Sequence, residues 1–289
     1  AGLLVYGSDN IFSNNFVLNN NETGMHIVEG SDNLVYNNFF GDNKINAKDD
    51  GTNFWNVTKG MVIDPYLVGY WKFDEGTGTT AYDTSTNDKT GTITAGNGGW
   101  TSGKIGGAYN FDGASTKIQS SSTFAIPSQM TFEAWIYPKS LGELSLGTVV
   151  WLGPDNGDGS HRFRVNTNNI VSFQVVWSTG AVSDVTQTNS ITLNTWQHVA
   201  ATYNNSSASN RPVVYINGRQ QTLTDSSNNS GTISLSANNW LVGNRSDSQL
   251  TFNGVIDQVR VFDYVRTPAQ IAWDYNHGSP LAYWKMDEA

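Results

Sequence analysis

The sequence predicts an all-β protein with two successive architectures, parallel coils stacked on one another and then an antiparallel sandwich. Three observations predict it. Short runs of β-branched and aromatic residues alternate with turn signals along most of the 289 residues. The first segment carries an internal repeat, which is typical of stacked coils. Only one stretch begins like a helix, where Thr267 precedes Pro268.

The repeat in the opening segment has a period of 23 residues. The residues Gly-Ser-Asp-Asn at 7–10 recur at 30–33, and the Asn-Asn pair at 14–15 recurs at 37–38. A degenerate third copy follows at 51–56. Asparagine tolerates the left-handed backbone region, and its amide can bond to the asparagine of the next coil. The pattern therefore predicts coils of a right-handed parallel β-helix.

These repeats resemble the NosD-like and pectate-lyase-like β-helices. Stacked repeats need about three units to bury their faces, and this segment offers two and a half. We therefore expect residues 1–64 to be the C-terminal coils of a larger β-helix. Trp55 and residues 57–62 are expected to close its open end, and Pro65 ends the segment.

The remainder, residues 65–278, has the pattern of antiparallel strands. The clearest strand predictions are residues 130–137, 170–177, 196–203 and 213–216. Asn217-Gly218 marks a hairpin turn after the last of these.

Seven sequence blocks in this part carry a resemblance to a known family. They stand at residues 70–76, 83–87, 108–113, 132–136, 195–200, 215–218 and 252–261. In content and order they resemble the laminin-G-like, concanavalin A-like jelly roll, which implies two curved antiparallel sheets and a terminal helix. Residues 281–288 repeat residues 68–75, so we expect 279–289 to be the first strand of a second such domain.

The same resemblance implies a structural calcium ion where the first and last strands meet. Carboxylate, amide and carbonyl oxygens are the ligands that calcium takes. Thr86 stands where the family's loop usually has glycine, and the alternative is that these acids cap turns or pair with Arg260 or Lys72. The predicted calcium ligands are Asp74, Asp83, Asn87 and Asp257.

Ten tryptophans suggest carbohydrate binding, because aromatic faces stack on sugar rings. Trp135 and Trp196 match core positions of the family, whereas other tryptophans flank polar loops. The loop 153–162 is the most polar and glycine-rich, and it predicts the rim of a groove, a second calcium loop or a plain hairpin loop. The predicted ligand-binding residues are Trp151, Asp155, Asn156, Arg162 and Trp177.

The residues do not predict an enzyme. Glycoside hydrolases need two carboxylates about 5–9 Å apart, but Glu133 stands alone in its strand. The four histidines are scattered, and His198 matches a structural position of the family. We therefore predict no catalytic residues.

The composition excludes other classes. A net charge of −9 argues against nucleic-acid partners, and no apolar run reaches the length of a membrane span. The absence of cysteine excludes disulfides and thiolate chemistry. Charged residues make up only 14%, which together with abundant small polar residues is typical of extracellular or cell-surface proteins.

The sequence thus predicts a non-catalytic module of a large extracellular or cell-surface protein, used for adhesion, carbohydrate binding or scaffolding. Its partner would be a glycan or a surface protein. One alternative is a structural subunit of a surface layer or filament, which would self-associate. Another is an accessory carbohydrate-binding module of a polysaccharide-degrading enzyme.

Overall fold

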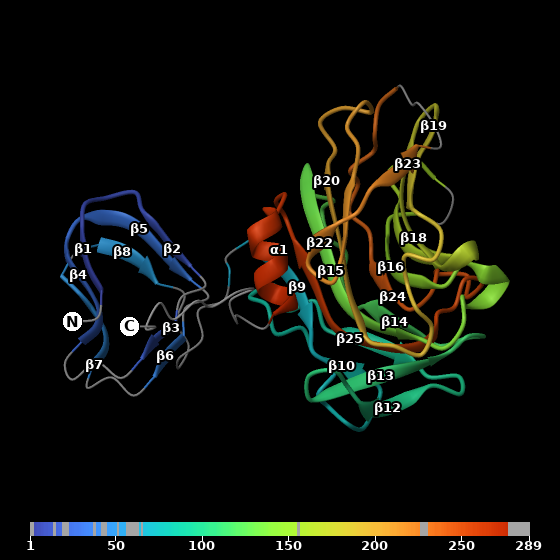
Figure 1. Ribbon diagram of the computed structural model, residues 1–289, viewed down its shortest axis with the longest axis horizontal. Helices are drawn as coiled ribbons and strands as arrows, with labels where there is room; N and C mark the ends of the chain where they lie inside the picture. Colours follow the sequence, from blue (N-terminus) through green and yellow to red (C-terminus); the bar gives the residue numbers. More distant parts are fainter. Residues whose placement is uncertain are drawn as a thin grey trace, which may run out of the picture. The chain divides into compact units, whose positions relative to one another are not determined.

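The computed structural model divides the chain into two compact units, Ala1–Leu67 and Val68–Ala289 (Figure 1). The structure describes all residues except 1–2, 14–15, 19–22, 37–38, 42–44, 51, 56–63, 65, 155–156, 226–230 and 277–289. The residues predicted to close the β-helix, 57–62, and those predicted to open a second domain, 279–289, lie outside the described residues.

The N-terminal unit consists of three stacks of parallel strands. Ile11 pairs with Leu34 and Phe16 with Phe39, so each strand lies beside its copy one repeat later. The parallel pairing predicted from the repeat is present, while the hand of the coil stays a prediction. The stacks are β1 (Leu3–Tyr6), β4 (Thr23–Glu29) and β7 (Ile45–Asp49); β2 (Ile11–Ser13), β5 (Ser31–Tyr36) and β8 (Thr52–Trp55); β3 (Phe16–Leu18) and β6 (Phe39–Gly41).

Asparagine side chains connect successive coils, as the repeat predicts. The Oδ1 atom of buried Asn33 accepts from the backbone and side-chain nitrogens of Asn10, both at 2.9 Å. Its Nδ2 donates to the carbonyl of Gly7 at 2.8 Å. Gly30 has φ +128°, and a Cβ atom there would lie 2.0 Å from the same carbonyl oxygen. The close approach of the two coils therefore requires glycine at position 30.

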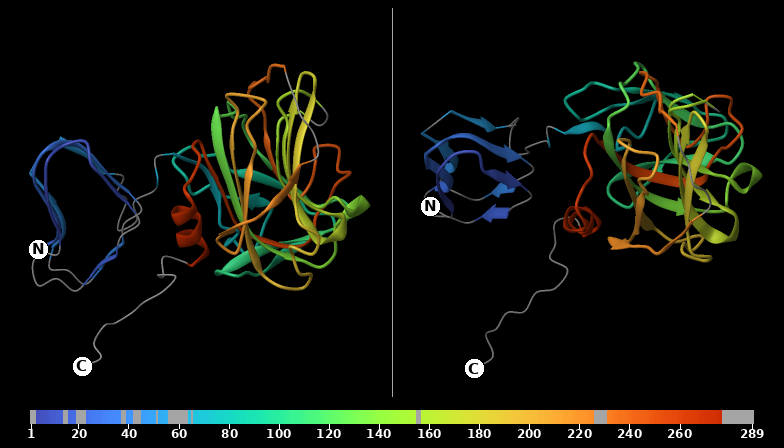
Figure 2. Two further views of the ribbon diagram at one scale, coloured as in Figure 1. Left: turned by 45° about the horizontal axis from the view of Figure 1, so that its top comes forward. Right: turned by 90° about the horizontal axis from the view of Figure 1, so that it is seen from above.

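The C-terminal unit is a sandwich of two antiparallel sheets (Figures 1 and 2). The nine-stranded sheet contains, in spatial order, β10 (Thr80–Ala81), β11 (Gly91–Thr94), β14 (Lys117–Ser120), β24 (Trp240–Val242), β16 (Thr148–Leu152), β17 (His161–Asn166), β18 (Ile170–Trp177), β19 (Gly180–Thr186) and β23 (Leu223–Asp225). The eight-stranded sheet contains β12 (Gly99–Ser102), β13 (Gly107–Asp112), β25 (Asn253–Phe262), β15 (Gln129–Pro138), β20 (Gln197–Asn204), β21 (Val213–Ile216) and β22 (Arg219–Gln220), with β9 (Leu67–Trp71) paired to β25.

Aromatic side chains from both sheets fill the space between them. Phe132 of β15 packs against Phe173 of β18, with ring centroids 5.7 Å apart, and against Trp240 of β24 at 5.4 Å. All three are buried. Because side chains alternate along a strand, the residues between these core positions point outward and form the two outer faces of the sandwich.

The helix α1 (Pro268–Tyr275) covers the outer face of the eight-stranded sheet (Figures 1 and 2). It begins at a capping box in which Thr267 and Gln270 satisfy each other's backbone nitrogens, as Thr267 before Pro268 predicts. Ile271 packs on Ala200 and Tyr215 of that sheet. No helix in the described part of the chain has the length and apolar character needed to cross a membrane.

Candidate functional site

A polar surface lies on the outer face of the nine-stranded sheet, which α1 does not cover (Figure 1). Val150, Phe163 and Phe173 point into the core, so their neighbours along β16, β17 and β18 point outward. We call this surface the arginine face. It consists of two cross-strand rows, Trp151–Arg162–Gln174 and Thr148–Arg164–Ser172, together with Arg245 from the loop after β24.

Trp151 forms the floor of the arginine face. Its side chain is 0% exposed and packs on Leu241 and Leu250. The guanidinium groups of Arg162 and Arg245 lie 4.5 Å and 5.7 Å from the ring centroid. The expectation that Trp151 offers an open stacking face is therefore wrong, because two arginines already cover the ring.

One neutral oxygen joins two of the arginines. Gln174 Oε1 accepts from Nη1 of Arg162 at 2.8 Å and from Nη2 of Arg164 at 3.3 Å. Arg245 is held differently, because its Nε donates to Asp247 Oδ1 at 2.7 Å and its Nη2 to Gln249 Oε1 at 2.9 Å. The predicted ligand-binding residue Arg162 thus belongs to a larger hydrogen-bonding surface.

Arg164 is buried, and the described residues supply no counter-charge for it. Its side chain is 8% exposed, and no carboxylate among the described residues lies within ion-pair distance of it. Burial, together with the nearby positive charge of Arg245, lowers the pKa of Arg164 to about 10. The sequence reasoning missed Arg164, although Arg162 and Arg164 stand two apart in a strand and therefore share a face.

Four buried polar atoms on the arginine face have no hydrogen-bond partner in the part of the chain that the structure describes. They are Thr148 Oγ1, Trp151 Nε1, Arg164 Nε and Ser172 Oγ. All four can donate a hydrogen bond, and two of them can only donate. Buried polar groups are rarely left unsatisfied, so these four atoms are suited to ordered water.

The other predicted ligand-binding residues do not join this surface. Trp177 is 4% exposed, lies in the core and donates from Nε1 to the Tyr203 hydroxyl at 3.3 Å. The expectation of an open ring at Trp177 is therefore wrong. Trp177 stands two residues after Val175, so the side chains of both residues point to the same side of the strand, into the core. Asp155 and Asn156 lie outside the described residues.

The predicted calcium ligands fall into separate groups. Both carboxylate oxygens of Asp83 accept hydrogen bonds in their own turn, from the nitrogens of Ser85 and Lys89 and from the Ser85 hydroxyl. Oδ1 also accepts from the Tyr70 nitrogen of β9 at 2.8 Å. Asp83 therefore acts as a turn cap, which was the alternative from the sequence. The Asn87 backbone nitrogen donates to Ser85 Oγ in the same turn.

Asp74 and Asp257 approach each other beside the turn at residues 103–107. Asp74 Oδ1 accepts from the Gly107 nitrogen at 2.6 Å, and Asp257 Oδ2 accepts from the Ile105 nitrogen at 2.9 Å. The second oxygen of Asp257 is buried and has no hydrogen-bond partner among the described residues. Burial raises the pKa of Asp257 to about 7, and the negative charge of Asp74 adds to the effect.

This pair fits part of a calcium site. Two carboxylates with one unpartnered oxygen are suitable hard ligands, but within the described ranges no group of three or more acidic or histidine side chains is placed to hold a metal ion. Backbone oxygens or water would have to supply the remaining ligands. Calcium therefore stays a prediction, now confined to Asp74 and Asp257.

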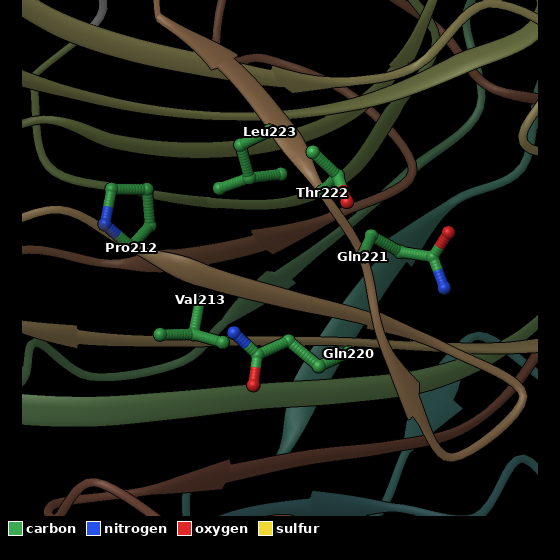
Figure 3. Close-up of a pocket in the computed structure, with 6 residues that line it drawn as sticks. All are labelled: Pro212, Val213, Gln220, Gln221, Thr222 and Leu223. Atoms are coloured by element: carbon green, nitrogen blue, oxygen red, sulfur yellow. The ribbon is translucent and has the colours of Figure 1, made fainter.

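A separate hollow of about 430 Å³ lies where the chain passes from β21 and β22 to β23 (Figure 3). Its lining residues are Pro212, Val213, Gln220, Gln221, Thr222 and Leu223. None of these side chains is ionisable, so the hollow offers neutral contacts only.

Comparison with known families identifies the class of the sandwich. Residues 111–272, more than half of the chain, match the family model described as the concanavalin A-like lectin/glucanases superfamily. The chain belongs to this family. Residues 1–76 match the model described as periplasmic copper-binding protein (NosD). Both resemblances drawn from the sequence are confirmed. A search of curated proteins found no match.

Solved structures share the fold of the sandwich at low sequence identity. The binding domain of Paraclostridial Mosquitocidal Protein 1 has a TM-score of 0.54 and 17% identity, covering 73% of this chain and 52% of that one. The receptor-binding domain of botulinum neurotoxin C/D mosaic serotype has a TM-score of 0.55 and 14% identity, covering 73% and 51%. The chain thus spans about half the length of these two domains. Domain 4 of AbnA, a GH43 extracellular arabinanase from Geobacillus stearothermophilus solved in complex with arabinotriose, has a TM-score of 0.49 and 22% identity, covering 72% and 97%.

Proposed function

We propose that the sandwich is a non-catalytic carbohydrate-binding module and that its ligand lies on the arginine face. The observation that carries this proposal is the row Trp151–Arg162–Gln174, in which two partly exposed hydrogen-bonding side chains stand beside a rigid aromatic floor. Saccharides present many hydroxyls in fixed directions, and binding sites recognise them through a few well-placed polar groups on a rigid surface.

The contrast between the two outer faces supports this choice. On the eight-stranded sheet, α1 packs over Ala200 and Tyr215. On the nine-stranded sheet, polar side chains of β17 and β18 occupy the equivalent position, and Arg162 and Gln174 keep partial exposure. A rigid sheet places these groups more accurately than a loop would.

A binding role without catalysis fits the positions of the carboxylates. Asp247, beside the arginine face, is held in an ion pair by Arg245. Glu133, which stands alone in its strand, is buried under α1 and contacts Arg266 at 3.0 Å. A glycoside hydrolase would need two available carboxylates flanking one sugar linkage, and these two lie on opposite outer faces of the sandwich.

The context of the module is also a proposal. We place the chain in a large extracellular or cell-surface protein, in which the N-terminal unit belongs to a parallel β-helix. The NosD description as periplasmic and the low charge of the chain support this location. An accessory module of a polysaccharide-degrading enzyme would use the arginine face in the same way. A surface-layer or filament subunit would instead bury it against another copy.

The experiment that tests the proposed function is glycan-array binding of the full chain, followed by matched variants. Arg162→Ala should reduce retention of any bound glycan about tenfold or more, since one charged hydrogen-bonding group is removed from the surface. Arg219→Ala, at an exposed position on β22, is the control and should bind like the wild type. Equal glycan binding by Arg162→Ala and the wild type would contradict the proposed site.

A further inference from the structure

Gln174 connects a buried guanidinium to the surface of the arginine face. It lies on β18 between Arg162 of β17 and Ser183 of β19. Its Oε1 accepts from Arg162 Nη1 at 2.8 Å and from Arg164 Nη2 at 3.3 Å. The side chain of Gln174 is partly exposed, whereas Arg164 is only 8% exposed.

These two contacts fix which end of the amide faces the arginines. A guanidinium donates hydrogen bonds and cannot accept them, so the atom on which two guanidiniums converge must be the amide oxygen. Burial lowers the pKa of Arg164 only to about 10, so this group stays protonated near neutral pH and remains a donor. A rotated amide would direct its N–H groups at two donors and lose both charge-assisted bonds. The amide nitrogen therefore lies on the side away from the arginines.

The amide nitrogen of Gln174 is free to donate. Nε2 has no hydrogen-bond partner among the described residues, and it is not one of the unpartnered polar atoms that are shielded from solvent. In this respect it differs from Thr148 Oγ1 and Ser172 Oγ, which are buried. A ligand on the outer face of the sheet can therefore contact Nε2.

Glutamines with a structural role in the sandwich use both ends of the amide. Gln197 accepts from the Thr192 nitrogen at 3.0 Å and donates to the Thr192 carbonyl at 2.8 Å. Gln258 accepts from a tyrosine hydroxyl and donates to a backbone carbonyl. Gln174 differs from both because only its oxygen is engaged, so its nitrogen has capacity left for a ligand.

We propose that Gln174 is a specificity-determining residue of the arginine face, which donates from Nε2 to an acceptor oxygen of the saccharide, and that Arg164 is the positioning residue that holds the amide in this orientation. This inference rests on the proposed function and names the chemistry of one contact in the same site. The oxygen selected is a ring, glycosidic, carbonyl or hydroxyl oxygen with a lone pair directed at the sheet. A hydroxyl that must donate at this position is disfavoured, because the amide oxygen is already engaged.

The deciding variant is Gln174→Glu, measured by isothermal titration calorimetry with the glycan that the wild type retains on the array. The carboxylate has the shape of the amide and accepts from the same arginines, but in its ionised form it cannot donate. We expect the affinity to fall at least about tenfold. Gln129→Glu, at an exposed position at the start of β15, adds the same charge and should bind like the wild type. Undiminished or tighter binding by Gln174→Glu would overturn the inference, since the saccharide would then be donating to this position.

The positioning role of Arg164 is tested through the amide that it orients. In NMR spectra of protein with isotope-labelled glutamine, the side-chain amide signals of Gln174 should move when the glycan is added to the wild type. Arg164→Leu removes one of the two bonds that orient the amide, so we expect these signals to shift and the affinity to fall about threefold or more. Arg164→Lys restores a cationic donor and should recover part of this loss.

Leucine suits the buried position of Arg164, so Arg164→Leu is expected to fold. Unchanged Gln174 signals and unchanged affinity in this variant would overturn the positioning role.

The outcomes separate the two proposals. If the wild type retains a glycan and Gln174→Glu binds it equally well, this inference fails, and the proposed function is still decided by Arg162→Ala. If the wild type retains no glycan, the proposed function fails and this inference fails with it.

Discussion

The guanidinium of Arg162 lies 4.5 Å from the centre of the Trp151 ring, and the ring is 0% exposed. The tryptophan therefore supports the arginine instead of contacting a ligand itself. A cation held over an aromatic face is stabilised there, more so when both groups are shielded from water. This relationship determines how variants at the two positions should differ.

Trp151→Leu should destabilise the sandwich by about 3 kcal/mol, because a fully buried indole is replaced by a smaller side chain. Urea unfolding measures the loss. Tyr82→Leu, at a side chain that is 58% exposed, is the control and should change the free energy of unfolding by less than about 0.5 kcal/mol. If Trp151→Leu folds as stably as the wild type and yet no longer binds glycan, the ring contacts the ligand directly.

Asp257 should make the stability of the sandwich fall as the pH rises. Its folded pKa of about 7 lies above the ordinary value of 3.8, so folding favours the neutral acid. The contribution is fully present below pH about 4 and is lost as the pH rises to about 7, with a total of up to about 4 kcal/mol. Asp257→Asn should remove this slope in thermal unfolding followed from pH 4 to 8 in EDTA. An unchanged slope would show that Asp257 is not the group responsible.

Calcium should reverse this effect if it binds at Asp74 and Asp257. A divalent cation favours the ionised carboxylates, so calcium at pH 7 should raise the Tm of the wild type and EDTA should lower it again. Asp257→Asn should show no such rise. Asp83→Asn should still respond, because the Asp83 oxygens are engaged in their own turn. A calcium response that depends on Asp83 and not on Asp257 would contradict this placement.

Glu133→Gln should destabilise the protein by about 3–5 kcal/mol, because it leaves the buried guanidinium of Arg266 with fewer counter-charges. Chemical denaturation measures the effect. The matched control is Asp88→Asn at an exposed turn, for which a change below about 0.5 kcal/mol is expected. A similarly small change in Glu133→Gln would mean that the buried contact between Glu133 and Arg266 does not stabilise the fold.

Much of the fold could be predicted from local patterns. The strand expected at 170–177 is β18 (Ile170–Trp177), and the one expected at 213–216 is β21 (Val213–Ile216). The 23-residue repeat predicted parallel pairing because each coil places a residue beside its own copy. A hydrophobic pattern predicts a strand reliably when the same periodicity holds along a continuous stretch of the sequence.

The site was harder to predict because it depends on contacts between distant segments. In the strand β16, Thr148 is followed by four consecutive apolar residues, so the sequence pattern does not show which side Trp151 occupies. The second arginine beside the ring, Arg245, stands far along the chain, after β24. The burial of Trp177 could have been predicted from the alternation along β18. Val171, Phe173 and Val175 occupy every second position before it and point into the core.

The most direct test of the carbohydrate-binding proposal is a crystal structure of the full chain with its bound glycan. We expect the sugar to lie on the outer face of β16, β17 and β18, in hydrogen-bonding contact with Arg162 and Gln174. A sugar bound instead in the hollow beside Pro212 and Leu223, or at the Asp74–Asp257 edge, would contradict the assignment of the arginine face as the binding site.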